Sequence, residues 1–194
     1  FSYKDFVYLD LTLRNDWSST LPEDNNSYLY PSVATSIVLS ELTDLNWLSL
    51  AKIRASWAEV GNDTDPYDLV TGYRAKENFG SNPRYTVPNI LLNENLKPEV
   101  TTSWEVGADL RFFNDRIGLD VTYYDNVTVD QIIQVDMSAA SGYGSQVINA
   151  GKMTNKGIEV MLNLTPVKIA GFQWDIRAHW AKNQNELVEL DGVI

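Results

Sequence analysis

One set of side chains in this sequence has the chemistry to bind a ligand directly. These residues lie where the regular alternation of apolar and polar positions is interrupted, so loops are expected there. Aromatic rings can stack on sugar rings, and planar amides can hydrogen-bond to sugar hydroxyls or peptide backbones. The candidates are Asn62, Asp63, Asp65, Tyr67, Tyr73, Arg74, Asn78, Tyr85 and Tyr143. The alternative is that they only pack against neighbouring loops, because long surface loops are mostly variable scaffold.

Calcium binding is a second chemistry that the residue types allow. Oxygen donors are crowded between Asn62 and Asp68, and calcium prefers hard oxygen ligands. The segment lacks the glycine and the terminal glutamate of an EF-hand loop, and Asx-rich turns also form without metal. The chain has no cysteine and one histidine, which excludes thiolate metal sites and argues against His-clustered sites and His-based triads. No cofactor is therefore expected, with calcium at 62–68 as the alternative.

Charged side chains recur at alternate positions of the extended segments. They are Asp10, Arg14, Lys52, Arg54, Glu105, Asp109, Arg111, Asp120, Glu159, Asp175 and Arg177, with His179 beside the last of them. A pair of carboxylates could act as acid and base in a hydrolase, but nothing in the sequence fixes the separation that this needs. His179 has no second imidazole or other partner residue for metal or acid–base chemistry. These residues therefore indicate a water-exposed wall, and no catalytic residue is expected.

A period-two alternation of apolar and polar residues must position these charges. The alternating segments are residues 7–14, 32–39, 51–58, 103–112, 117–124, 157–164 and 172–181. No stretch has a convincing 3.6-residue apolar period. The pattern predicts an all-β chain of about seven strands with one apolar face and one charged face.

The predicted connections alternate between long and short. The longest spans residues 61–100, while 113–116 and 166–171 read as turns. Bacterial outer-membrane barrels place short turns at the periplasmic rim and longer loops outside, and a soluble sandwich has no reason to keep this order. Residues 127–135 are expected to extend the fifth strand above the membrane, and the residues from Lys182 to form a polar tail.

Aromatic residues lie near both ends of several predicted strands. Trp47 and Trp57 flank the third strand, and Trp174 and Trp180 lie toward opposite ends of the last. About ten residues of tilted strand cross a hydrocarbon core, and aromatic rings prefer its two interfaces. The spacing favours an antiparallel transmembrane β-barrel over a soluble sandwich, in which the same residues would form the core.

Composition and strand number narrow the class of protein further. The 15 basic and 26 acidic residues among 194 give a net charge of −11, which argues against a nucleic-acid surface. No apolar run is long enough for a transmembrane helix. Seven strands would leave an open edge in lipid, and single-chain bacterial barrels have an even number. Residues 1–194 are therefore expected to be part of a larger barrel domain.

Four ordered segments carry a family resemblance. They are Arg14–Pro22 (RNDWSSTLP) followed by Tyr30-Pro31-Ser32, Ile53–Asp63 (IRASWAEVGND), Asn95–Gly107 (NLKPE and SWEVG), and Ile148–Glu159 (INAG and NKGIE). Together they resemble the SusC/RagA-type TonB-dependent outer-membrane transporters of Bacteroidetes. The resemblance implies a C-terminal portion of a barrel of about 22 strands, with the plug domain and the other strands outside these residues.

The resemblance also implies a function. It is the energised uptake of oligosaccharides or peptides across the bacterial outer membrane, with a SusD-like surface lipoprotein as a lid and TonB acting on the plug. The charged residues would line the lumen, the apolar face would contact lipid, and the loop 61–100 with Tyr143 would contact ligand or lid. Two alternatives stay open, namely a soluble secreted all-β domain that binds glycans and a membrane-embedded hydrolase.

Overall fold

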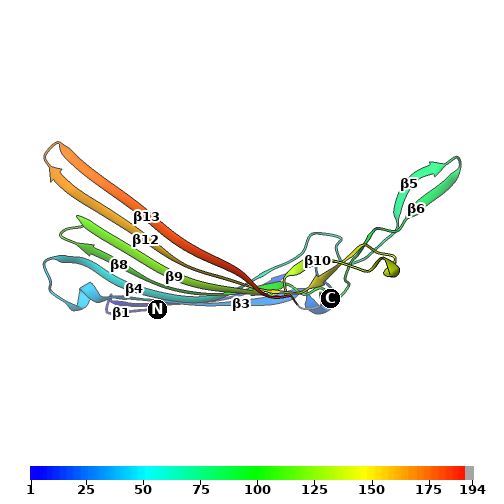
Figure 1. Cartoon of the computed structure of the whole chain (residues 1–194). Coiled ribbons are helices and arrows are strands. Elements are labelled where there is room, and N and C mark those ends of the chain that lie inside the picture. The colour runs from blue at the N-terminus through cyan, green and yellow to red at the C-terminus, as the bar shows by residue number, and fades with distance from the viewer. Residues whose placement is uncertain (191–194) are drawn as a thin grey trace.

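The computed structural model describes residues 1–190, and its main feature is an open, curved antiparallel sheet of eight strands (Figure 1). The strand order is β1-β2-β3-β4-β8-β9-β12-β13. Their bounds are β1 (Ser2–Tyr3), β2 (Val7–Trp17), β3 (Ser27–Val38), β4 (Leu48–Asn62), β8 (Glu99–Phe112), β9 (Ile117–Val129), β12 (Lys152–Ile169) and β13 (Phe172–Glu189). The seven long strands contain the alternating segments of the sequence, except for Leu39 at the end of one of them, so the all-β prediction is confirmed.

Smaller elements are inserted between these strands. A three-stranded sheet contains β10 (Ile132–Asp136), β11 (Ser145–Asn149) and β7 (Ile90–Leu91), and a hairpin contains β5 (Arg74–Phe79) and β6 (Asn82–Thr86). The only helical turns in the described residues are three 3₁₀ segments, η1 (Glu23–Asn25), η2 (Leu39–Leu42) and η3 (Ala139–Ser141). No helix within residues 1–190 is long and apolar enough to cross a membrane.

The connections of the main sheet lie at two opposite ends. Residues 18–26, 63–98 and 130–151 form the loop end, from which the β5–β6 hairpin projects (Figure 1). Residues 39–47, 113–116 and 170–171 form the turn end. The predicted alternation of long and short connections is wrong for the first pair, because 18–26 and 39–47 have equal length.

Strand register places the predicted charged residues on one face of the main sheet. Residues paired across an antiparallel ladder point to the same side. One such row runs from Asp10 through Ala34 and Ser56 to Glu105, and on to Tyr124. The other predicted wall residues lie an even number of positions from members of such rows, so they share this face, which we call the polar face.

The opposite face is apolar, and its aromatic edge runs obliquely across the strands. Trp57 and Trp104 are register partners, with ring centroids 6.3 Å apart. In β13 the comparable residue, Trp180, lies in register with Val160, Val121 and Ala108, which is four positions closer to the turn end than Trp104. In a barrel, the strands are tilted relative to the membrane normal. Aromatic residues at one depth in the membrane are therefore expected at different register positions on neighbouring strands.

Three predicted strand boundaries are wrong. β12 continues through Pro166 to Ile169, so the turn at its end is only Ala170 and Gly171. Proline has no N–H for the ladder, and the register shifts between Leu164 and Val167. This bulge returns Val167 and Ile169 to the apolar face, opposite Trp174 and Phe172.

The other two errors concern the loop end. The fifth long strand ends at Val129, because Asp130 has a φ of 56° and Ile132 begins β10, which pairs with β11. The residues Lys182–Glu189 are not a tail, since they continue β13 and pair with β12. Local polarity misled the second prediction, because strands that rise beyond a membrane need no apolar face there.

Candidate functional site

The side chain of Asn149, in the INAG segment, fastens two loops of the loop end together. Its Oδ1 accepts a hydrogen bond from the backbone N–H of Lys97 at 2.8 Å, and its Nδ2 donates to the carbonyl of Lys97 at 2.8 Å. The same Nδ2 donates to the carbonyl of Asp130 at 2.8 Å. Asn149 therefore joins the end of the long loop to both stems of the loop 130–151.

Asp63 and Glu99 fasten the other loop bases. Asp63 accepts hydrogen bonds from the hydroxyls of Ser18 and Thr20, the latter at 3.1 Å. Glu99 accepts one from Asn62 at 3.2 Å and one from the backbone N–H of Ile132 at 2.8 Å. The side chains of the candidates Asn62 and Asp63 thus form hydrogen bonds that join the loop bases.

A few buried residues complete this junction. Leu96 is fully buried, and Leu21 and Ala150 are nearly so. Asn25 donates a hydrogen bond to the carbonyl of Leu96 at 3.3 Å. We call the contacts of Asn149, Asp63, Glu99 and Leu96 the loop-base junction. In the sequence, the residues of this junction are recognisable only as parts of family motifs. Their contacts could not be predicted, because they join residues far apart in the chain.

The remaining candidates of the long loop point outward. Tyr67 is 93% exposed and Tyr73 is 78% exposed, and both line a groove of about 400 Å³ together with Arg74 and Asp68. Tyr85 lies opposite Ala75 in the β5–β6 hairpin, and Asn78 lies near the tip of β5. Tyr143 follows η3 in another loop. The structure therefore brings together Tyr67, Tyr73 and Arg74, but not the whole set.

The segment 62–68 does not assemble a cluster of metal ligands. Asp63 is occupied by hydroxyl donors, and Asp68 accepts a hydrogen bond from Thr64 at 3.3 Å. Asp65 lines a hollow with Asp63 and Asp68. Within residues 1–190, no group of three or more His, Cys, Asp and Glu side chains is placed to hold a metal ion. Calcium binding here has no support from this arrangement.

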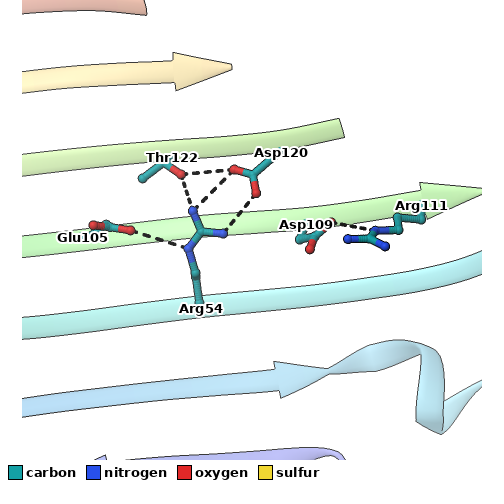
Figure 2. Close-up of polar contacts among 6 residues, drawn as sticks. All are labelled: Arg54, Glu105, Asp109, Arg111, Asp120 and Thr122. Atoms are coloured by element: carbon teal, nitrogen blue, oxygen red, sulfur yellow. Dashed lines mark hydrogen bonds and ion pairs between the residues drawn. The ribbon is translucent and has the colours of Figure 1, made fainter. Parts of the chain in front are cut away.

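On the polar face, Arg54 is the centre of an ion-pair network that spans three strands (Figure 2). Its guanidinium lies 3.3 Å from the carboxylate of Asp120 and 3.5 Å from that of Glu105, and it donates a hydrogen bond to Thr122. To reach β9 from β4, the side chain passes over Gly107 of β8, where a Cβ would lie 2.8 Å from the guanidinium carbon. The glycine of the SWEVG segment therefore makes room for Arg54.

The other predicted wall residues are distributed along this face. Arg14 pairs with Asp16 at 2.7 Å, and Arg111 pairs with Asp109 at 3.6 Å. Residues near the turn end line one hollow of about 510 Å³, and they include Asp109, Arg111, Asp120, Asp175, Arg177 and His179. Asp10, Lys52 and Glu159 lie on the same face in other rows. Opposite charges are interspersed, which is typical of a solvated wall and gives no isolated acid–base pair.

The Gly107→Ala variant is expected to lower barrel stability by about 1 kcal/mol relative to a Gly→Ala change without a clash, because the added methyl displaces the partly exposed guanidinium of Arg54 from Asp120. The measurement is the midpoint of denaturation by heat or urea in the full-length protein. Gly118→Ala is the matched control, since its Cβ would lie 3.5 Å from the nearest atom of Asn163, an ordinary contact on the same face. Equal midpoints for the two variants would contradict this role for Gly107.

Comparison with known proteins gives consistent matches along the chain. The family described as TonB dependent receptor-like, beta-barrel matches residues 1–189. TonB-dependent receptor P26 of Formosa agariphila is 32% identical over 100% of this chain and 20% of its own length. TonB-dependent receptor SusC of Bacteroides thetaiotaomicron is 32% identical over 93% of this chain and 19% of its own length.

Solved structures give the same result. The structure of the RagAB peptide transporter aligns with a TM-score of 0.91 at 25% identity, covering 99% of this chain and 22% of that chain. The chain therefore spans about a fifth of the length of the relatives that it matches. These relatives do not favour a soluble glycan-binding domain.

Proposed function

This chain belongs to the family of TonB-dependent receptor β-barrels and forms part of an outer-membrane barrel, and we propose that its parent protein is a SusC-type transporter. Its activity would be the energised uptake of oligosaccharides or peptides. The observation that carries the proposal is the division of one sheet into a charge-compensated polar face and an apolar face with an aromatic edge. That division suits a wall between water and lipid.

In this proposal the polar face lines the lumen and the apolar face contacts outer-membrane lipid. The sheet is open, and an unpaired strand edge is not stable inside a bilayer. Further strands of the parent would therefore pair with β1 and β13, and a plug domain would fill the lumen. We propose no catalytic role, since the carboxylates of the polar face are paired with cations or spread over several strands.

The partners follow from the same proposal. TonB would act on the plug from the periplasm, at the turn end. A SusD-like surface lipoprotein would cover the loop end, where the loop-base junction holds the loops and the exposed rings of Tyr67 and Tyr73 project beyond it. Exposed aromatic residues at loop tips are common in protein–protein contacts.

The test is a mild-detergent pull-down of the full-length parent from native membranes, with the co-purifying proteins identified by mass spectrometry. A stoichiometric surface lipoprotein is expected. A parent that stays in the outer-membrane fraction without this partner would contradict the lidded transporter and leave a single TonB-dependent receptor. A parent that is soluble without detergent would contradict the proposal altogether.

Removal of the β5–β6 hairpin is expected to spare assembly but to reduce uptake or lid binding. Arg74 and Thr86 are register partners, so a short Gly-Ser linker can replace the hairpin without moving its ends. The measurement compares the amount of heat-modifiable barrel with the rate of solute uptake. If the shortened protein takes up solute normally, the hairpin makes no substrate or lid contact that uptake needs. If the barrel is lost, the hairpin is required for folding of the wall, which contradicts the expectation.

A further inference from the structure

A row of uncharged amide and hydroxyl side chains crosses the polar face on its loop side. Asn126 lies in register with Ser103 on one side and with Asn155 on the other, and Asn155 lies in register with Asn185. Four neighbouring strands, β8, β9, β12 and β13, thus contribute one residue each. We call these four residues the asparagine row.

Two residues of the adjacent row connect to it. Asn183 donates hydrogen bonds through its Nδ2 to the hydroxyl of Tyr124 at 3.0 Å and to Oδ1 of Asn155 at 2.8 Å. The ring of Tyr124 lies across Gly157, where a Cβ would come within 2.4 Å of the ring. The glycine of the NKGIE segment therefore lets Tyr124 lie flat against the wall beside the asparagine row.

These contacts leave hydrogen-bonding groups for a ligand. Both hydrogens of the Asn183 amide are used, while its Oδ1 accepts no hydrogen bond from the described residues. Across residues 1–190, the Nδ2 of Asn155 and the whole amide of Asn126 likewise make no side-chain hydrogen bond to protein. The wall thus offers both donors and acceptors, together with an aromatic ring.

The position of the row suits a solute that enters from the loop end. Ser103 and Asn126 are next in sequence to Trp104 and Asp125, which point to the apolar face at its loop-side aromatic edge. Ser103, Tyr124, Asn126 and Asn155 line a hollow of about 640 Å³. Three charged side chains, Arg54, Glu105 and Glu159, also line the hollow, but they lie closer to the turn end than the asparagine row, and Arg54 pairs with Glu105 at 3.5 Å.

We propose that the asparagine row, with Tyr124 and Asn183, is a binding subsite for a neutral oligosaccharide on the lumen wall. A sugar hydroxyl both donates and accepts hydrogen bonds, so it can bind either the Nδ2 or the Oδ1 of an amide. A sugar ring can also pack on the ring of Tyr124. The residues of the row carry no charge, so the row itself offers no ion pair to the charged termini of a peptide. The inference rests on the proposed function, since it names the substrate class of that transporter.

The experiment measures binding to the full-length detergent-purified protein, with a panel of neutral oligosaccharides and a panel of oligopeptides as probes. The wild type is expected to bind at least one oligosaccharide. Asn155→Leu should weaken that binding about tenfold, as expected for lost hydrogen bonds that are worth about 1 kcal/mol each. Asn126→Ala is the second variant, because the Asn126 amide fastens no other side chain among the described residues.

Asn163→Leu is the matched control, since Asn163 lies on the same face of β12 but toward the turn end, in register with Gly118 and Arg177. It should bind the oligosaccharide as the wild type does. The proposal is overturned if Asn155→Leu and Asn126→Ala bind as the wild type does, if all three variants weaken binding equally, or if the wild type binds no oligosaccharide in the panel.

Failure of the proposed function would look different. Heat-modifiable barrel and uptake by living cells are measured on the same variants. A parent that assembles and transports, yet whose asparagine-row variants bind unchanged, would contradict only this inference. A parent without a barrel or without uptake would contradict the transporter itself.

Discussion

The Val160→Arg variant is expected to fail to assemble into the outer membrane. Val160 lies on the apolar face of β12, between Val121 and Trp180 in register, so the arginine would point into lipid. An arginine near the bilayer midplane costs about 2–4 kcal/mol, and less toward the interfaces. The measurement is the amount of heat-modifiable, folded protein in the outer-membrane fraction. Leu119→Arg, between Leu110 and Leu162, should behave in the same way.

Met161→Arg is the matched control for this experiment. Met161 is the next residue along β12 but points to the polar face, between Asp120 and His179 in register. An arginine there stays in water and gains a carboxylate neighbour, so normal assembly is expected. If both arginines block assembly, or if neither does, the assignment of the two faces is wrong.

The Asn149→Leu variant is expected to release the loops of the loop end while the wall remains folded. The change removes all three hydrogen bonds of the side chain and leaves the backbone groups of Lys97 and Asp130 without their partner. Because Asn149 is only half-buried, water can replace part of this loss, and a cost of about 1–3 kcal/mol is expected. The measurement is hydrogen exchange of the Lys97 amide, which should become markedly faster, together with proteolysis of the long loop.

Asn95→Leu is the control for the loop-base junction. Asn95 belongs to the NLKPE segment, but only its backbone N–H makes a hydrogen bond among the described contacts, to Asn93 at 2.9 Å. Its replacement should leave exchange of the Lys97 amide unchanged. If Asn95→Leu and Asn149→Leu accelerate that exchange equally, the bridge formed by Asn149 is not what holds the loops.

The loop-base junction also explains what several family motifs are for. The WSSTLP segment contributes the hydroxyls that bind Asp63, and VGND contributes Asp63 itself. NLKPE provides Leu96, Lys97 and Glu99, and INAG provides Asn149. Motif residues thus fasten the loops to the wall, and the segments between the motifs are not part of this junction.

The sequence alone determined the seven long strands, their two faces and the family. Alternation is a local property, because successive side chains of any strand point to opposite sides whatever the partner strand is. For this reason Arg54, Asp109 and Asp120 could be assigned to one face before their contacts were known. The ends of β12 and β13 could not, since pairing carried these strands past residues whose own polarity indicates a loop or a turn. The end of β9 could not either, because the chain turns at Asp130 in a left-handed conformation and the following residues pair in another sheet.

Only the tertiary structure decided which distant residues meet. The period of a strand does not specify its register with a neighbour, so the alignment of Asn126 with Asn155 became visible only once β9 and β12 were paired. The same holds for Asn149 and Lys97, which are 52 positions apart in the chain. The sequence therefore determined the long strands of the wall and their two faces, whereas register and loop closure decided which polar side chains lie next to one another along that wall.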